Sequence, residues 1–190
     1  MTQGHFQSRP TTNAKSVTVT VTYLEQTNRP AFPPKPSPKG KIAILQAIEI
    51  PIHYYRYLYR LVGDSCNWVS RRRMSDQDLK DVIHHPDVEI YILYANGAPA
   101  GFGEIDRRND AFHEIKFFGL APEFQGRRLG GFFLSNIIDI AWAKDPQKVR
   151  LETCTLDHPA ALPLYQKYGF DVYDRRDGVV ELMDQPPTPN

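Results

Sequence analysis

Short stretches in which apolar and polar residues alternate run through the chain and predict several β-strands. Residues 16–25 (SVTVTVTYLE) alternate and are rich in β-branched side chains, as in a half-exposed strand. The strongest signal covers residues 88–108, where Asn96-Gly97 separates two alternating runs and favours a tight hairpin turn. Further strand patterns occupy residues 41–50, 111–121 and 148–156, and residues 169–183 indicate a closing hairpin that turns at Asp177-Gly178.

One segment carries apolar residues at helical spacing. Leu129, Phe133, Ile137 and Ala141 recur at intervals of four residues, and Ile140 completes the apolar stripe. This pattern predicts an amphipathic helix that packs on a sheet.

Residues typical of helix ends mark three shorter helices. An aromatic segment begins at Pro51 and ends at Gly63, as a short helix would. Ser75 is suited to cap a helix that ends near Ile83, and residues 158–169 predict another helix. Strands and helices in this order predict an α/β fold in which a mixed sheet carries helices on both faces.

Three segments lack any periodicity. Residues 1–15 and 184–190 are polar and are expected to be loose termini. Residues 29–41 contain so many prolines that only an extended connection is possible. Since 190 residues with 41% hydrophobic side chains suffice for one well-buried core, we expect a single domain over residues 16–183.

Charge and cysteine content exclude several classes of protein. The formal net charge is +1, so no general attraction to nucleic acid or to anionic membrane is expected. No apolar run approaches the roughly 18 residues of a membrane span, and the N-terminus lacks the apolar core of a signal peptide, which predicts a cytoplasmic protein. Cys66 and Cys154 are too few for a disulfide framework or a zinc site; both are expected to be ordinary buried thiols, and no metal is expected.

A glycine-rich basic turn, GLAPEFQGRRLGG, joins a predicted strand to the long predicted helix. Gly126, Gly130 and Gly131 allow the backbone to approach a ligand closely. Arg127 and Arg128 add positive charge where the helix begins. Free N–H groups at a helix start together with this charge suit a phosphate.

Two motifs in this part of the chain resemble the GCN5-related N-acetyltransferase (GNAT) superfamily. The first is EIKFFGLAPEFQGRRLGG, and the second, LDHPAALPLYQKYGF, follows it in the expected order. The resemblance implies the GNAT fold, which is a mixed, mostly antiparallel central sheet flanked by helices on both faces. It also implies acetyl-CoA as co-substrate.

The resemblance assigns coenzyme-binding residues at three places. The turn that would wrap the pyrophosphate consists of Gln125, Gly126, Arg127, Arg128, Leu129, Gly130 and Gly131. Arg128 departs from the family, which usually has glycine there, and its side chain must point outward. Phe118, Gly119 and Leu120 correspond to the strand that pairs with the pantetheine arm. His158 stands where relatives often carry an asparagine that bonds the same arm, although it could equally cap the next helix.

Two residues are candidates for proton transfer. Acetyl transfer to an amine needs a base for the ammonium and an acid for the departing thiolate. The resemblance places Tyr165 as the acid, although a tyrosine at this helical position could instead belong to the core. Glu114 matches a carboxylate that acts as base in some relatives, and Glu104 on the preceding strand is its rival. Either could act through a water, and the amine would attack directly in a ternary complex.

The acceptor is the least determined part of the reaction. It would be an amine on a small molecule or a protein. Tyr54, Tyr55, Tyr57 and Tyr59 lie in the region that meets the acceptor in this fold, but they read more readily as helix core. Arg71 to Arg73 could form a solvated face or hold an anion. A homodimer is possible, and a non-catalytic acyl-CoA-binding regulator and a nucleic-acid-binding module are the alternatives to an enzyme.

Overall fold

The computed structural model describes residues 16–182, so the predicted loose termini, residues 1–15 and 184–190, lie outside the described residues. A seven-stranded sheet has the order β2-β3-β4-β5-β6-β1-β7, and β5 and β6 are its parallel pair. The strands are β1 Ser16–Gln26, β2 Ile42–Gln46, β3 Val88–Ala95, β4 Ala98–Asp106, β5 His113–Leu120, β6 Val149–Cys154 and β7 Asp171–Glu181. The helices are α1 Ile52–Gly63, α2 Asp76–Ile83, α3 Leu129–Trp142 and α4 Ala161–Lys167, with short 3-10 turns η1 Asp64–Cys66 and η2 Pro122–Phe124.

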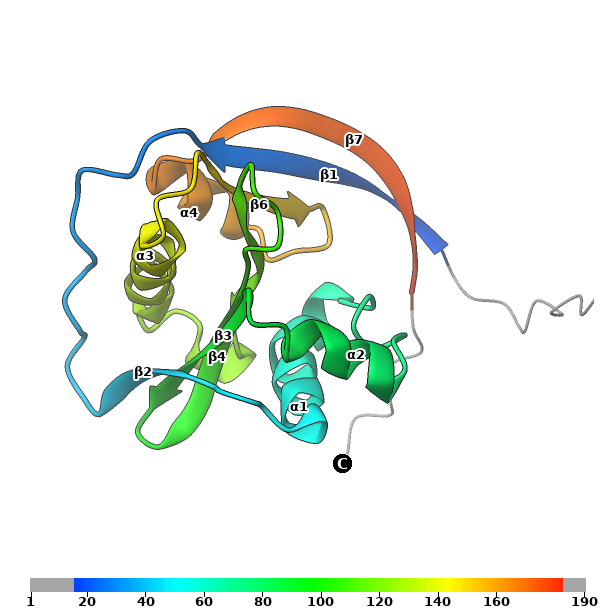
Figure 1. The fold of residues 1–190 in the computed structure, drawn as a ribbon, viewed down its shortest axis with the longest axis horizontal. Helices are drawn as coiled ribbons and strands as arrows, with labels where there is room; N and C mark the ends of the chain where they lie inside the picture. The colour runs from blue at the N-terminus through cyan, green and yellow to red at the C-terminus, as the bar shows by residue number, and fades with distance from the viewer. Residues whose placement is uncertain (1–15, 183–190) are drawn as a thin grey trace, which may run out of the picture.

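Helices cover both faces of this sheet (Figure 1), which confirms the predicted α/β architecture. On one face, α3 buries Phe133 and Ile137 completely in a cluster that also includes residues of α4. On the other face, α1 buries Tyr55 and Leu58 against α2 and the sheet. Apolar residues on both sides of the central strands account for the two cores.

Local signals at one turn and at one helix start are confirmed. Asn96 and Gly97 adopt φ angles of 53° and 88°, and Ala95 pairs with Ala98 across the hairpin. Positive φ at both central residues is the geometry for which the Asn-Gly pair is favoured. Ser75 caps α2, because its Oγ accepts a hydrogen bond from the amide of Asp78 at 3.1 Å.

The predicted closing hairpin is wrong. Residues 171–181 form one continuous strand, β7, which pairs with β1 along its whole length and arches over the sheet (Figure 1). Asp177 and Gly178 lie opposite Thr20 and Val19, and Thr20 Oγ1 donates a hydrogen bond to Asp177 Oδ1 at 2.7 Å. Pairing with a long neighbouring strand therefore overrides the local turn preference of Asp-Gly.

The strand expected over residues 41–50 is shorter than predicted. β2 ends at Gln46, and Glu49 adopts the left-handed conformation, with a φ of 48°. A turn thus separates β2 from α1, which begins directly after Pro51 as expected.

Residues 29–41, which we call the strap, form the extended connection that was predicted. The strap passes along the outside of α3 on its way from β1 to β2 (Figure 1). Arg29 forms an ion pair with Asp139 at 2.5 Å, and the backbone amide of Lys35 donates to Ser135 Oγ at 2.9 Å. The strap therefore runs antiparallel to α3, toward the N-terminus of that helix.

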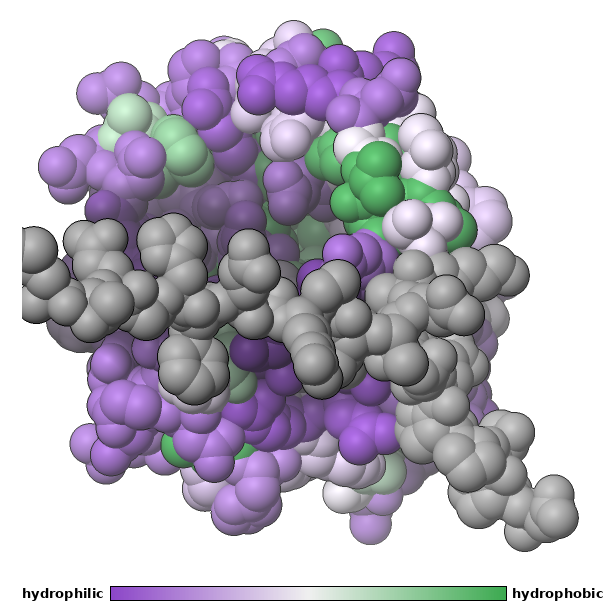
Figure 2. Space-filling model, turned by 90° about the vertical axis from the view of Figure 1, so that its right-hand side faces the viewer, coloured by the Kyte–Doolittle hydropathy of each residue, from purple (hydrophilic) through white to green (hydrophobic). Residues whose placement is uncertain are grey.

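The face of the molecule shown in Figure 2 is mostly hydrophilic, with its largest group of hydrophobic atoms at the upper right and smaller groups elsewhere. Within residues 16–182, no helix combines the length and the apolar character that crossing a membrane demands.

Candidate active site

The central feature of the site is a separation between β5 and β6. The two strands pair only at His113 with Val149 and at Glu114 with Arg150. β5 continues to Leu120 and remains paired with β4 on its other side. Backbone groups of β5 beyond Glu114 that face β6 are therefore free to bind another extended chain, as the pantetheine assignment requires.

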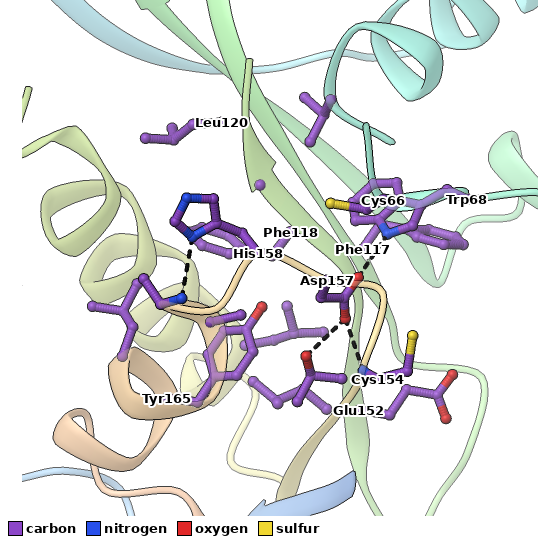
Figure 3. A pocket seen from close by; sticks show the side chains of 18 of the residues that line it. Cys66, Trp68, Phe117, Phe118, Leu120, Glu152, Cys154, Asp157, His158 and Tyr165 are labelled. Carbon is purple, nitrogen blue, oxygen red and sulfur yellow. Dashed lines mark hydrogen bonds between the residues drawn. The ribbon is translucent and has the colours of Figure 1, made fainter. Parts of the chain in front are cut away.

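A cavity of about 640 Å³ occupies this opening. β5 forms one wall with Phe118, Gly119 and Leu120, and Trp68 from the loop after α1 stands on the same side (Figure 3). β6, the loop after it and α4 form the other wall. Of the residues predicted to act, those that line the cavity are Phe118, Gly119, Leu120, Gln125, Gly126, Arg128, Gly130, Gly131, His158 and Tyr165. Arg127, Leu129 and Glu114 do not line it.

The glycine-rich turn presents free amides to the open end of this cavity. Gly126 has a φ of 72°, and Arg128, at the N-cap of α3, is also left-handed with a φ of 62°. Within residues 16–182, the amides of Gly126, Arg127 and Arg128 donate no hydrogen bond to the protein. These donors, together with the start of a 14-residue helix, form a suitable cradle for a pyrophosphate.

The two arginines of the turn have different environments. Arg128 lines the cavity, and its left-handed backbone explains why relatives favour glycine at this position. The Arg127 guanidinium lies over the ring of Phe124, 5.1 Å from its centroid. Leu129 is almost completely buried, so its side chain belongs to the core and only its backbone faces the turn.

Close packing explains the glycine on the β5 wall. A Cβ on Gly119 would lie 2.4 Å from Val62 Cγ1 of α1, which is too close for any side chain. The neighbouring Phe118 packs on Phe133 of α3, with ring centroids 5.2 Å apart. The wall is therefore fixed from both faces of the sheet.

Tyr165 projects from α4 into the cavity, with its hydroxyl toward the space between His158 and Asp157 (Figure 3). Its ring is buried, and among the described residues its Oη has no hydrogen-bond partner. Burial, with a smaller effect of Asp157, raises the pKa of Tyr165 far above its ordinary value. The phenol is therefore protonated at neutral pH and its O–H is available as a donor.

His158 begins the turn that leads into α4. Its Nδ1 accepts from the amide of Ala160 at 3.1 Å, and its carbonyl accepts from the amide of Ala161 at 2.8 Å. Its ring nevertheless lines the cavity (Figure 3). The N-cap of α4 is Ala160, and no side chain caps this helix. The expected helix cap is therefore wrong, and contact of His158 with the pantetheine arm stays a prediction.

An aspartate that the sequence did not single out joins the two walls. Asp157 Oδ1 accepts from Trp68 Nε1 at 3.2 Å, while Oδ2 accepts from Thr153 Oγ1 and from the amide of Cys154 (Figure 3). No sequence signal could have found this contact, because 89 residues separate Trp68 from Asp157.

Charged side chains gather just beyond the point where β5 and β6 part. Lys116 and Glu152 line the cavity, and Lys116 Nζ lies 3.0 Å from Glu114 and 3.8 Å from Glu152. Burial alone would lower the pKa of Lys116, but the two carboxylates raise it. Lys116 thus joins Glu114, which lies outside the cavity lining, to Glu152, which lines it. Successive side chains of a strand point to opposite faces of the sheet, and this alternation along β5 and β6 could have identified Lys116 and Glu152 as residues of the site.

Glu104, the rival base, is fully buried and does not line the cavity. Tyr55 Oη donates to it at 2.5 Å, and Arg71 forms an ion pair with it at 2.5 Å. Glu104 thereby fixes the loop that carries Trp68. Arg71 is thus part of a buried pair and not of a solvated arginine face.

The remaining candidates divide by burial. Tyr55 and Tyr59 are core residues, in agreement with the predicted helix core, whereas Tyr57 is exposed. Cys66 and Cys154 are free thiols that line the cavity, and burial raises the pKa of each. Within residues 16–182, no group of His, Cys, Asp and Glu side chains is arranged to hold a metal ion.

Comparison with known families bears on what this cavity binds. The profile of the acetyltransferase (GNAT) family matches residues 55–170, a span that contains β5, the glycine-rich turn, β6 and Tyr165. The chain belongs to the GNAT acetyltransferase family. Acetyl-CoA is the co-substrate of GNAT proteins, and the free edge of β5 and the free amides of the turn fit its pantetheine arm and pyrophosphate.

Solved structures share the fold of this GNAT chain. A GNAT family acetyltransferase from Elizabethkingia anophelis, with acetyl-CoA bound, is 26% identical, with a TM-score of 0.52, over 72% of this chain and 80% of the other. A functionally unknown protein from Staphylococcus epidermidis is 18% identical (TM-score 0.55), and a Drosophila protein is 12% identical (TM-score 0.62). Each of these two matches covers 89% of this chain, which spans only 63% and 52% of their lengths. No curated protein matches the chain.

Proposed function

We propose that the protein transfers the acetyl group of acetyl-CoA to an amine by direct attack in a ternary complex. The observation that carries the proposal is the hydroxyl of Tyr165, which enters the cavity between the separated strands without a protein partner among the described residues. A coenzyme-binding regulator would need the turn but would not need this donor. Positioning of two substrates in one cavity accounts for most of the acceleration expected of such an enzyme.

The coenzyme would lie along the cavity from the turn to the charged end. Backbone amides of the turn residues would bind the pyrophosphate, with Arg128 adding a charge-assisted contact. Phe118, Gly119 and Leu120 would pair with the pantetheine arm through their backbone. His158 would contact the same arm through the ring atoms that its bond to the amide of Ala160 leaves free.

Tyr165 would donate a hydrogen bond to the sulfur as the thioester breaks. A thiol has a pKa of about 8.5, so a phenol with a raised pKa is a poorer acid than the thiol that forms. Complete transfer of the proton to the thiolate is therefore unfavourable, and stabilisation by the hydrogen bond is the larger contribution. The proton that the thiolate finally takes comes from the attacking ammonium.

Glu114 is the proposed base, acting through a water, because its carboxylate does not line the cavity and binds Lys116. Glu152 is a second candidate, because it lines the cavity and its side chain is 42% exposed. The carboxylates of Glu152 and Asp157 both line the cavity and support a cationic acceptor. An amine is a cation before it loses its proton.

The test is a screen of amines with acetyl-CoA, followed by release of free thiol and by mass of the product. The Tyr165→Phe variant is compared with Tyr173→Phe, which alters an exposed tyrosine outside the cavity. We expect turnover to fall about 100-fold in the first variant only, with binding of acetyl-CoA retained in both. Binding without turnover of any amine in the unmodified protein would favour the regulator.

A further inference from the structure

The strap is a basic segment beside the coenzyme cavity. Between Gln26 and Glu49 the chain contains Arg29, Lys35, Lys39 and Lys41 but no acidic residue. Arg29 is neutralised by Asp139 of α3. Lys35, in contrast, forms no ion pair with any carboxylate in residues 16–182.

The ammonium of Lys35 lies at the first turn of α3. Its Nζ is 5.2 Å from the centroid of the Tyr168 ring, and Tyr168 Oη donates to the carbonyl of Gly131 at 2.8 Å. A Cβ on Gly131 would stand 3.3 Å from this Nζ and 2.8 Å from Tyr168 Oη. Glycine at 131 thus leaves room for both groups, and Gly131 itself lines the cavity.

Three cationic residues lie at or beside the start of α3, where positive charge is least favourable. The N-terminus of a helix carries a partial positive charge, and Lys35, Arg127 and Arg128 all lie near that of α3. The first turn of α3 contains no acidic residue that would compensate them. Such an arrangement costs free energy in the unliganded protein, and an anion at the same place would remove that cost.

The position of Lys35 is built into the fold. Its amide donates to Ser135 Oγ, and prolines on both sides restrict the backbone of the strap. The strap is further held by Phe32, whose ring packs edge-on to that of Tyr168 at 5.7 Å. The backbone is therefore ordered before a ligand arrives, and only the methylene stem of the lysine must move.

We propose that Lys35 binds a phosphate group of coenzyme A, so that the strap supplies part of the coenzyme site. This inference rests on binding of acetyl-CoA in the cavity but not on the nature of the acceptor. The phosphate is either the pyrophosphate in the turn or the 3′-phosphate of the adenosine. Lys35 does not line the cavity in this structure, and its long side chain reaches the phosphate from beside Gly131.

Calorimetric titration at low salt with acetyl-CoA and with its analogue lacking the 3′-phosphate tests the proposal. Three variants are compared: Lys35→Gln, Lys35→Arg, and Lys80→Gln, which removes an exposed lysine from α2 on the opposite face of the sheet (Figure 1). We expect Lys35→Gln to weaken acetyl-CoA about fivefold, Lys35→Arg to restore most of the loss, and Lys80→Gln to bind as the unmodified protein does.

The analogue identifies the phosphate. If Lys35→Gln weakens both ligands equally, the contact is to the pyrophosphate; if it weakens only acetyl-CoA, the contact is to the 3′-phosphate. Thermal unfolding gives a second readout. Because Lys35→Gln removes a repelling charge, the melting temperature of the free protein should stay unchanged or rise. The further rise in melting temperature that acetyl-CoA causes should be smaller in this variant. Equal affinities for Lys35→Gln and Lys80→Gln would overturn this inference alone, whereas failure of the unmodified protein to bind acetyl-CoA would overturn the proposed function with it.

Discussion

Trp68 Nε1 donates a hydrogen bond to Asp157 Oδ1 at 3.2 Å and thereby joins the loop after α1 to the loop after β6 across the coenzyme cavity (Figure 3). The two residues belong to walls that the separation of β5 from β6 leaves without backbone pairing. This bond therefore fixes the width of the cavity on the side where Trp68, Val69 and Ser70 line it.

Trp68→Phe keeps an aromatic ring but removes the donor. A hydrogen bond to a carboxylate contributes about 1.5 kcal/mol, so we expect the free energy of unfolding to fall by about that amount. The KM for the acceptor should rise, because one wall of the cavity loosens, while the Kd for acetyl-CoA stays nearly constant. Trp142→Phe is the control: Trp142 Nε1 also donates a buried hydrogen bond, to Gln26, and neither residue lines the cavity. Equal effects of the two variants on KM would contradict this role.

Arg128→Gly should have opposite effects on the stability of the fold and on the affinity for acetyl-CoA. A residue other than glycine in the left-handed conformation costs about 1–2 kcal/mol, and replacement by glycine removes this cost. Part of the stabilisation is lost again, because glycine has more conformational freedom in the unfolded chain. We expect the free energy of unfolding to rise by up to about 1 kcal/mol while acetyl-CoA binds more weakly. Urea unfolding and calorimetry measure the two quantities. Arg127→Gly should not stabilise, since Arg127 has no positive φ.

Removal of Glu104 should have a large structural effect. Its side chain is fully buried, and Glu104→Gln would leave Arg71 charged without a partner in the same place. Loss of one member of a buried ion pair costs about 3–5 kcal/mol, which urea unfolding would detect. The exposed pair of Arg73 with Glu181 is the comparison, and Glu181→Gln should cost less than about 1 kcal/mol. Similar costs for both would show that the buried pair does not anchor its loop.

The raised pKa of Tyr165 predicts a difference at alkaline pH. Because its pKa is higher in the folded than in the unfolded protein, the stability due to the protonated phenol is present below the ordinary value of 10.0 and is lost as the pH rises above it. Unmodified protein should therefore lose up to about 1.4 kcal/mol more per pH unit above pH ~10 than Tyr165→Phe does. Parallel stability curves for the two proteins would show that Tyr165 ionises normally.

Local signals in the sequence predicted local structure well. Asn96-Gly97 and Ser75 act through their own backbone geometry, so their roles can be read without knowledge of the fold. The glycine-rich turn is also local, and ten of the predicted site residues line the cavity.

Features that depend on distant partners could not be predicted in the same way. Asp177-Gly178 has the sequence of a turn, but pairing with β1 holds it in a strand. Lys35 and Asp157 act on residues that lie about 90 or more positions away in the chain, so no spacing rule connects them to the cavity. Glu114 was placed by resemblance, and its ion pair with Lys116 became visible only in the structure.

Amide hydrogen exchange with and without acetyl-CoA tests the central claim most directly, since the account requires the coenzyme to occupy the gap between β5 and β6. We predict that acetyl-CoA slows exchange at residues 116–120, where β5 lacks a partner on one side, and at the turn amides of residues 126–131. Binding that leaves both segments unprotected would contradict the assignment of this cavity to the coenzyme.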